Sequence, residues 1–248
     1  MRAVVTGAGG FIGRAVAARL RAMGAEVVTL PTRAWDTPAR IREIQPHVVY
    51  HLGWCARGDY LESLDNLNCL DHSLKLIQAL RPGTRLVVAG TCYERSSGCL
   101  YAACKRALRE VVLGLPLDVF WGRIHFLYGP GEAENRLVPM VTRQLRAGLT
   151  PKLNDATRVL DYLHVEDVAS ALLAPLSGTH DIGLGVGTTP RTIVETLAEI
   201  LGRPGYPDGS PTAEVPIVAD ARALYATGWS PGFDLYGGLS DVVRPKPK

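Results

Sequence analysis

Short apolar runs alternate with longer amphipathic stretches along the first half of the chain. The apolar runs cover residues 3–5, 26–30, 48–52, 85–89 and 118–123, and helical patterns cover residues 11–23, 38–44, 61–80 and 101–113. Strands that alternate with helices are typical of a parallel sheet with helices on both faces. The runs are apolar at nearly every position, as expected where both faces of a sheet are covered. The pattern therefore predicts an α/β fold with a doubly wound parallel sheet.

The pattern changes after Gly129-Pro130-Gly131. We expect helices over 137–147 and 192–201, a short strand over 182–185, and a loop rich in Gly and Pro from 202 to 216. We therefore assign residues 1–128, with returning segments near 155–190, to the sheet domain. Most of 129–248 forms a small lobe carried on it.

The first apolar run leads directly into Gly7-Ala8-Gly9-Gly10-Phe11-Ile12-Gly13 and a helical pattern. Glycines permit a tight strand-to-helix turn, let the backbone approach a pyrophosphate, and let the helix pack on the strand. Free N–H groups at the helix start then face the anion. A plain tight turn would also explain the glycine spacing, but its position between a strand and a helix indicates a dinucleotide site. The candidate cofactor-binding residues here are Gly7, Gly9, Gly10, Phe11, Ile12 and Gly13.

Composition excludes several other classes. The chain has 248 residues, 47% of them hydrophobic, and a net charge of +3 from 27 basic and 24 acidic residues without a basic stripe. Nucleic acid is therefore not an expected partner. No apolar run approaches the roughly 20 residues that span a bilayer, and we expect a cytoplasmic protein. The five cysteines show no CxxC pair, so we expect reduced thiols and no metal site.

Two residues with acid–base potential open the fourth predicted helix. Tyr101 and Lys105 are four residues apart, so they share one face of that helix. A neighbouring ammonium, together with the positive ring of an oxidised nicotinamide, would lower the pKa of the phenol towards working pH. Thr91 ends the fourth apolar run and would lie at the carboxyl edge of the sheet, where ligands bind in this architecture.

With these features in this order, the chain resembles the extended short-chain dehydrogenase/reductase family, in its nucleotide-sugar epimerase, dehydratase and ketoreductase branch. The resemblance covers nearly the whole chain and implies a Rossmann-type dinucleotide-binding domain with a small C-terminal substrate-binding lobe. Further segments that carry it are 51–53, 123–131, 136–139, 161–169, 219–220 and 228–229.

The resemblance implies a role for each matching residue. Tyr101 would be the catalytic acid or base, Lys105 would hold the nicotinamide ribose, and Thr91 would hydrogen-bond the substrate oxygen. Leu52 and Gly53 would line the nicotinamide ribose, whereas we interpret Tyr50 and His51 as strand core. Arg136 and Tyr93 are candidate substrate contacts, although a solvated arginine and a loop aromatic are equally good interpretations.

The end of the second predicted strand bears on the cofactor. An NAD-selective site places an acidic residue there to bind the ribose 2′-hydroxyl. Pro31 stands in that position, and Arg33 could meet a 2′-phosphate with its planar fork. NADP(H) is therefore favoured over NAD(H), with an ordinary exposed arginine as the alternative.

The reaction type follows from the cofactor and from the residues after Thr91. A net reductase commonly uses NADPH, and family dehydratases follow the threonine with an Asp-Glu pair, whereas Cys92-Tyr93 stand here and Glu94 is out of register. We therefore predict reduction of a keto group, at C4, on a nucleotide-linked deoxy-keto sugar, by hydride transfer with Tyr101 as proton donor. The alternatives are a nucleotide-sugar epimerase with retained cofactor and a non-catalytic dinucleotide sensor.

The chain departs from the family at three places. The segment 93–100 is shorter than usual, Phe126 stands where an asparagine often grips the sugar nucleotide, and the late lobe is small. The sugar carrier is therefore left open. Predicted helices 61–80 and 101–113 carry extra apolar residues, and in the family such helices pair across a dimer, although burial within one chain explains much of this pattern. We expect a homodimer.

Overall fold

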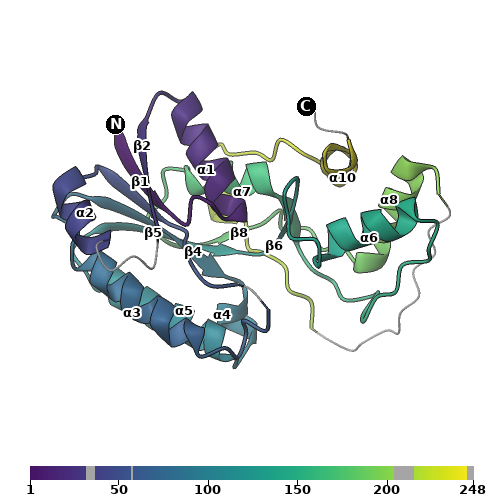
Figure 1. The fold of residues 1–248 in the computed structure, drawn as a ribbon, viewed down its shortest axis with the longest axis horizontal. Coiled ribbons are helices and arrows are strands. Elements are labelled where there is room, and N and C mark those ends of the chain that lie inside the picture. The colour runs from purple at the N-terminus through teal and green to yellow at the C-terminus, as the bar shows by residue number, and fades with distance from the viewer. Residues whose placement is uncertain (32–36, 57, 204–214, 245–248) are drawn as a thin grey trace.

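The alternating pattern folds as a three-layered α/β domain in the computed structural model (Figure 1), which describes residues 1–31, 37–56, 58–203 and 215–244. The described residues form a six-stranded parallel sheet in the order β2-β1-β3-β4-β5-β8. Its strands are β1 (Arg2–Thr6), β2 (Glu26–Leu30), β3 (Val48–His51), β4 (Arg85–Thr91), β5 (Asp118–Ile124) and β8 (Gly178–Ile182). The predicted doubly wound parallel sheet is thus confirmed.

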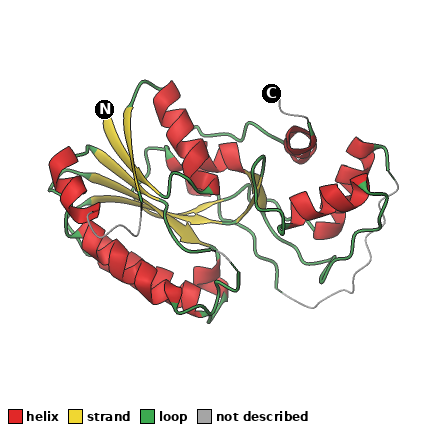
Figure 2. Ribbon diagram, in the orientation of Figure 1, coloured by secondary structure: helices red, strands yellow, loops and turns green. Residues whose placement is uncertain are grey.

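Helices cover both faces of this sheet (Figure 2). On one face, α1 (Phe11–Ala22) and α7 (Val165–Leu172) pack over a core that includes Val5, Phe120 and Ile182. The other face carries α2 (Thr37–Ile44), α3 (Asp65–Ile77) and α5 (Leu100–Leu113), over a core that includes Trp121. Because both faces are covered, the central strands are buried at almost every position.

A separate core holds the C-terminal lobe together. It lies among α6 (Leu137–Arg146), α8 (Pro190–Leu201) and α10 (Leu235–Val243), with Val141, Ile193, Leu197 and Leu239 fully buried. A two-stranded parallel pair, β6 (Phe126–Tyr128) and β7 (Tyr162–His164), lies between the sheet and the lobe (Figure 1). The chain therefore crosses into the lobe after β6 and returns to the sheet through β7 and α7.

Several predicted boundaries were wrong. The strand expected over 182–185 runs from Gly178 to Ile182, because β8 continues the sheet beside β5 and its hydrogen-bonded register ends at Ile182. The helix expected over 61–80 is shorter, Asp65–Ile77. Residues 61–64 form turns before it, and residues 78–80 form a tight turn after it. The apolar pattern did not indicate β6, β7, α7, α10, or the single-turn helices α4 (Tyr93–Ser96) and α9 (Arg222–Tyr225).

Candidate active site

The glycine turn joins β1 to α1 with no room for side chains at two positions. Gly7 has φ +70°, and a Cβ there would lie 2.6 Å from the Cα of Gly53. A Cβ on Gly13 would lie 2.1 Å from the carbonyl oxygen of Gly7. A Cβ on Gly9 would meet nothing within 4 Å. The turn therefore requires glycine at positions 7 and 13. At position 9 the structure shows no steric requirement for glycine.

The start of α1 is open to an anion. Gly10, its N-cap, offers no side-chain hydrogen bond, and the first turn contains no acidic residue. Phe11 and Ile12 in that turn are half-buried and pack against the core. Backbone N–H groups at a helix start without a capping side chain favour a phosphate. The turn therefore fits the pyrophosphate of a dinucleotide, and NAD(P) when bound would supply the hydride chemistry.

Arg14 ties this turn to the loop that leads into the lobe, which the sequence did not indicate. Its guanidinium donates to the carbonyl oxygens of Gly9 and Gly131, each over 2.9 Å. Gly131 belongs to the segment directly before the lobe. The two segments that flank the expected ligand site are thereby linked by one exposed side chain.

The carboxyl end of β3 lies directly against the glycine turn, where Gly53 approaches Gly7. A chain of hydrogen bonds organises this contact. The Gly53 N–H donates to Thr6 Oγ1 over 3.4 Å, and Thr6 Oγ1 lies 2.8 Å from His51 Nδ1. His51 Nε2 lies 2.8 Å from Ser73 Oγ, which donates to the carbonyl oxygen of Cys69. Since that serine proton is used, His51 donates through Nε2 and accepts through Nδ1.

Burial, with a smaller contribution from the Lys105 charge, lowers the pKa of His51 to about 3. His51 is therefore a neutral histidine of the core, and Tyr50 is buried too, which confirms the interpretation of both as strand core. Leu52 is half-buried beside them.

Tyr101 and Lys105 lie in the first turns of α5, beneath the residues that follow β3. The Tyr101 ring packs edge-on against Trp54 and Tyr60, with centroids 6.2 Å and 5.1 Å away. The ammonium of Lys105 lies 3.9 Å from the centroid of the Trp54 ring and 5.9 Å from that of Tyr101. It donates to the carbonyl oxygen of Ala89 over 2.7 Å. The structure thus brings the predicted pair together, and adds Trp54 and Tyr60, which the sequence analysis missed.

The pKa values of this pair differ from the expectation. Burial raises the pKa of the Tyr101 phenol, and hydrogen bonding to Thr91 offsets this only in part. Burial also lowers the pKa of Lys105 to about 7, although the Glu94 charge opposes that shift. The predicted lowering of the Tyr101 pKa by Lys105 is therefore not found in the chain alone. Its phenol is protonated at neutral pH and can act as a proton donor.

Thr91 ends β4 at the predicted edge, and a buried carboxylate holds it there. Glu94 Oε1 accepts hydrogen bonds from the Thr91 N–H and from the Trp121 indole, both over 2.9 Å. Glu94 Oε2 accepts from Arg109 of α5 over 2.9 Å, and the carboxylate is completely buried. Both oxygens are thus engaged away from solvent. The sequence placed Glu94 near the site but did not indicate its partners.

The candidate substrate contacts lie where the sheet domain meets the lobe. Tyr93 is half-buried and packs edge-on against Phe126, with ring centroids 6.0 Å apart. Phe126 packs in turn on Tyr162 of β7. Arg136 is exposed, and its guanidinium lies 5.6 Å from the ring centroid of Tyr60. Since the Tyr60 ring also packs against Tyr101, a continuous series of side-chain contacts leads from Arg136 to the expected reaction centre.

Arg33 lies outside the described residues. Pro31 lies at the end of β2, where its carbonyl oxygen accepts a hydrogen bond from the Thr37 hydroxyl over 2.8 Å.

The described part of the chain contains no group of His, Cys, Asp and Glu suited to hold a metal ion. No helix within it is long and apolar enough to span a membrane.

Comparison with known proteins assigns the chain to a family. The model of the NAD dependent epimerase/dehydratase family matches residues 3–182. The chain belongs to this family of nucleotide-sugar enzymes.

One relative and two solved structures align along almost their entire length. UDP-glucose 4-epimerase of Mycolicibacterium smegmatis is 25% identical over an alignment of 309 positions, gaps included, that covers 98% of each protein. The structure of UDP-glucose 4-epimerase from Thermus thermophilus in complex with NAD superposes with a TM-score of 0.80 at 25% identity, covering 98% of both chains. RMD from Pseudomonas aeruginosa, in complex with NADPH, gives a TM-score of 0.80 at 22% identity, over 98% of this chain and 97% of that one. Structures of this fold thus hold either NAD or NADPH.

Proposed function

We propose that this protein reduces a keto group, at C4, of a nucleotide-linked deoxy-keto sugar with NADPH. The observation that carries the proposal is the pair of Tyr101 and Glu94. The Tyr101 pKa is raised by burial, so its phenol holds the proton that a reduction consumes. Glu94 has both carboxylate oxygens engaged in buried hydrogen bonds, so it is a poor base for elimination of water.

Each residue of the site has a separate role in the proposed reduction. The reduced nicotinamide, when bound, supplies the hydride to the carbonyl carbon. Tyr101 gives its proton to the carbonyl oxygen, so the C=O bond becomes an alcohol and a phenolate forms. The Thr91 hydroxyl lies at the same sheet edge and would orient that oxygen. Lys105, with its pKa near 7, can carry positive charge beside the new phenolate and favour its formation.

The choice of NADP(H) rests on the residues after β2. Pro31 replaces the acidic residue that an NAD-selective site uses, and the arginine two positions later supplies a charge for a 2′-phosphate. RMD, with the same fold, binds NADPH, whereas the Thermus thermophilus epimerase binds NAD. These comparisons support either cofactor, so the preference depends on the sequence of this chain.

Epimerisation of a nucleotide sugar is the second candidate. It is favoured by the 98% mutual coverage with a UDP-glucose 4-epimerase. An epimerase returns the hydride to its own substrate and consumes no NADPH overall, so the two candidates differ in stoichiometry.

Absorbance of the reduced nicotinamide separates the candidates. We expect steady oxidation of NADPH, faster than of NADH, with at least one member of a panel of nucleotide-linked 4-keto-6-deoxy sugars. Tyr101→Phe should reduce turnover by about 10²–10⁴-fold while cofactor binding persists. Interconversion of two sugars without net oxidation would instead establish the epimerase. No turnover together with tight dinucleotide binding would favour a sensor.

A homodimer through α3 and α5 remains part of the proposal. These neighbouring helices expose Leu67, Val111 and Leu113, each more than 40% accessible. Exposed apolar side chains on adjacent helices favour a partner surface. Light scattering should give twice the chain mass, and Val111→Glu should restore the monomer.

A further inference from the structure

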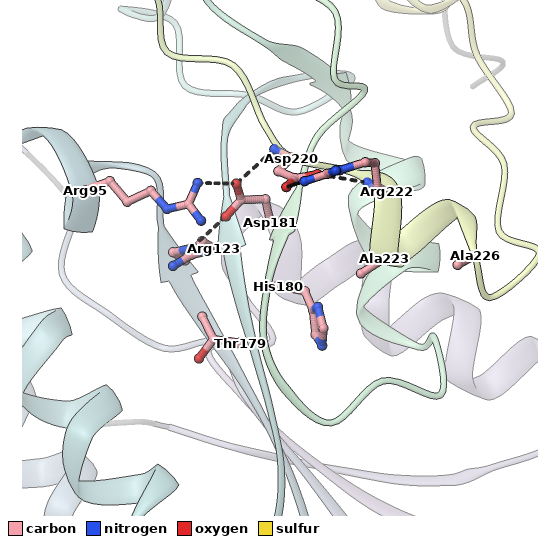
Figure 3. A pocket seen from close by; sticks show the side chains of 9 residues that line it. All are labelled: Arg95, Arg123, Thr179, His180, Asp181, Asp220, Arg222, Ala223 and Ala226. Carbon is pink, nitrogen blue, oxygen red and sulfur yellow. Dashed lines mark hydrogen bonds and ion pairs between the residues drawn. The ribbon is translucent and has the colours of Figure 1, made fainter.

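A pocket lies at the edge of the sheet formed by β8 (Figure 3). Its volume is about 460 Å³. Strand β8 forms this edge because it pairs only with β5. The lining comes from α4, β5, β8 and the segment around α9, and consists of Arg95, Arg123, Thr179, His180, Asp181, Asp220, Arg222, Ala223 and Ala226. Thr91, Tyr101 and Lys105 are not among these residues.

The carboxylates of the pocket are already paired with arginines. Asp181 is 1% exposed, and it accepts hydrogen bonds from Arg123 Nε over 2.6 Å, Arg95 Nη1 over 3.0 Å and the Asp220 N–H over 3.0 Å. Asp220 accepts two side-chain hydrogen bonds from Arg222, over 2.8 Å and 2.6 Å. Figure 3 shows Arg95 and Arg123 directed at Asp181, and Arg222 directed at Asp220. Arginine side chains therefore already compensate the charge of both carboxylates.

The arginines, by contrast, keep unused donors. Arg123 donates only through Nε, and the described residues supply no acceptor for its two terminal nitrogens. Its side chain is 12% exposed. Arg95 likewise uses one terminal nitrogen and is 54% exposed. Unpaired N–H groups on a largely buried guanidinium favour an acceptor-rich partner.

The charge balance leads to the same class of ligand. Three arginines face two aspartates in the pocket, so these side chains leave a net positive charge. His180 Nε2 lies 2.8 Å from the carbonyl oxygen of Ser177, so that nitrogen carries its proton. The volume falls in the range of small-molecule sites, which is about 300–1,000 Å³, and exceeds the needs of a single ion.

We propose that this pocket binds a small organic anion through its carboxylate or phosphate group, held by Arg123 and Arg95, with Arg222 at the mouth. Phosphate and carboxylate share the acceptor geometry that arginine recognises. The site is independent of the redox function proposed above, because it uses none of its residues.

NMR of the arginine Nε–Hε and His180 resonances tests the proposal at the site itself. Inorganic phosphate and citrate are titrated separately at constant ionic strength, set with sodium chloride. We expect a saturable shift of the Arg95, Arg123 and His180 signals with at least one of the two. Comparison of the two anions shows whether phosphate or carboxylate is preferred. Absence of a saturable shift with both anions in the wild-type protein would overturn the proposal.

Variants separate binding from a structural role of the ion pairs. Arg95→Gln should weaken the anion about tenfold, as expected for one lost charge-assisted hydrogen bond. Arg95→Lys keeps the positive charge but loses the planar guanidinium with its paired N–H donors, so it should give an intermediate affinity. Arg143→Gln is the matched control, since Arg143 is 59% exposed and ion-paired to Glu134 outside the pocket, and should leave the titration unchanged. Equal affinity in all three variants would contradict the proposal.

Discussion

Glu94 Oε1 accepts a hydrogen bond from the backbone N–H of Thr91 over 2.9 Å. The same carboxylate binds Arg109 of α5 and the indole of Trp121 on β5. Since Tyr101 also belongs to α5, one buried group connects the strand end that carries Thr91 to the helix that carries Tyr101. We therefore expect Glu94 to set the relative position of these two residues.

Removal of this carboxylate should destabilise the fold and impair catalysis. Glu94→Ala leaves Nη1 of Arg109 and two buried N–H donors without their partner, at a cost of about 3–5 kcal/mol. Glu94→Gln keeps an acceptor for Thr91 and Trp121, so it should cost less and retain more turnover. Urea unfolding measures the free energy, and steady-state kinetics should show the loss mainly in kcat.

Glu110→Ala is the control for this pair of variants. Glu110 also pairs with Arg109, over 2.7 Å, but is 72% exposed. Its removal should change the free energy of unfolding by about 1 kcal/mol or less. If Glu94→Ala were equally mild, the connecting role of Glu94 would be wrong.

Substitution by alanine should destabilise one glycine position of the turn and leave another unaffected. In Gly13→Ala the new Cβ would lie 2.1 Å from the Gly7 carbonyl oxygen, and because this atom belongs to the backbone, the turn must shift. We expect a lower midpoint of thermal unfolding and loss of NADPH binding, measured by quenching of protein fluorescence. Gly9→Ala meets no atom within 4 Å and should keep the wild-type midpoint. Equal midpoints for the two variants would contradict the steric argument.

The sequence predicted the parts of this molecule that depend on local pattern. Strand Glu26–Leu30 and the requirement for glycine at positions 7 and 13 follow from runs of a few residues. The partners of Glu94 do not, because Arg109 and Trp121 lie 15 and 27 residues away in sequence. The direction of the Tyr101 pKa shift was missed for a related reason. It is set by burial, which depends on Trp54 and Tyr60 folding over the ring.

Thr6 should prove necessary for the contact between β3 and the glycine turn. Thr6→Val keeps the shape of the side chain but leaves His51 Nδ1 and the Gly53 N–H without their partner. An unsatisfied buried polar group costs about 1–3 kcal/mol, so we expect a loss of that size in urea unfolding. Thr29→Val is the matched control because Thr29 is an exposed strand residue, and it should not lower stability. A similar loss in both variants would exclude the hydrogen-bond chain as the cause.

Lys105 should make the stability of the protein depend on pH in the alkaline range. Burial lowers its pKa from 10.5 to about 7, so between these values the unfolded chain holds a proton that the folded chain has lost. Where the unfolded state binds more protons, the free energy of unfolding rises with pH. Below about pH 7 both states are protonated, and the fold carries the full cost of burying the ammonium.

Comparison with Lys105→Met isolates this contribution, because the other titrating groups are common to both proteins. The free energy of unfolding of the wild type, minus that of the variant, should increase from pH 7 towards pH 10 and stay constant below the window. Lys75→Met serves as the control, since Lys75 is 60% exposed in an ion pair with Asp71, and its difference from the wild type should not rise in this way. A difference for Lys105→Met that is independent of pH would mean that the lysine keeps its ordinary pKa, and that burial does not lower it.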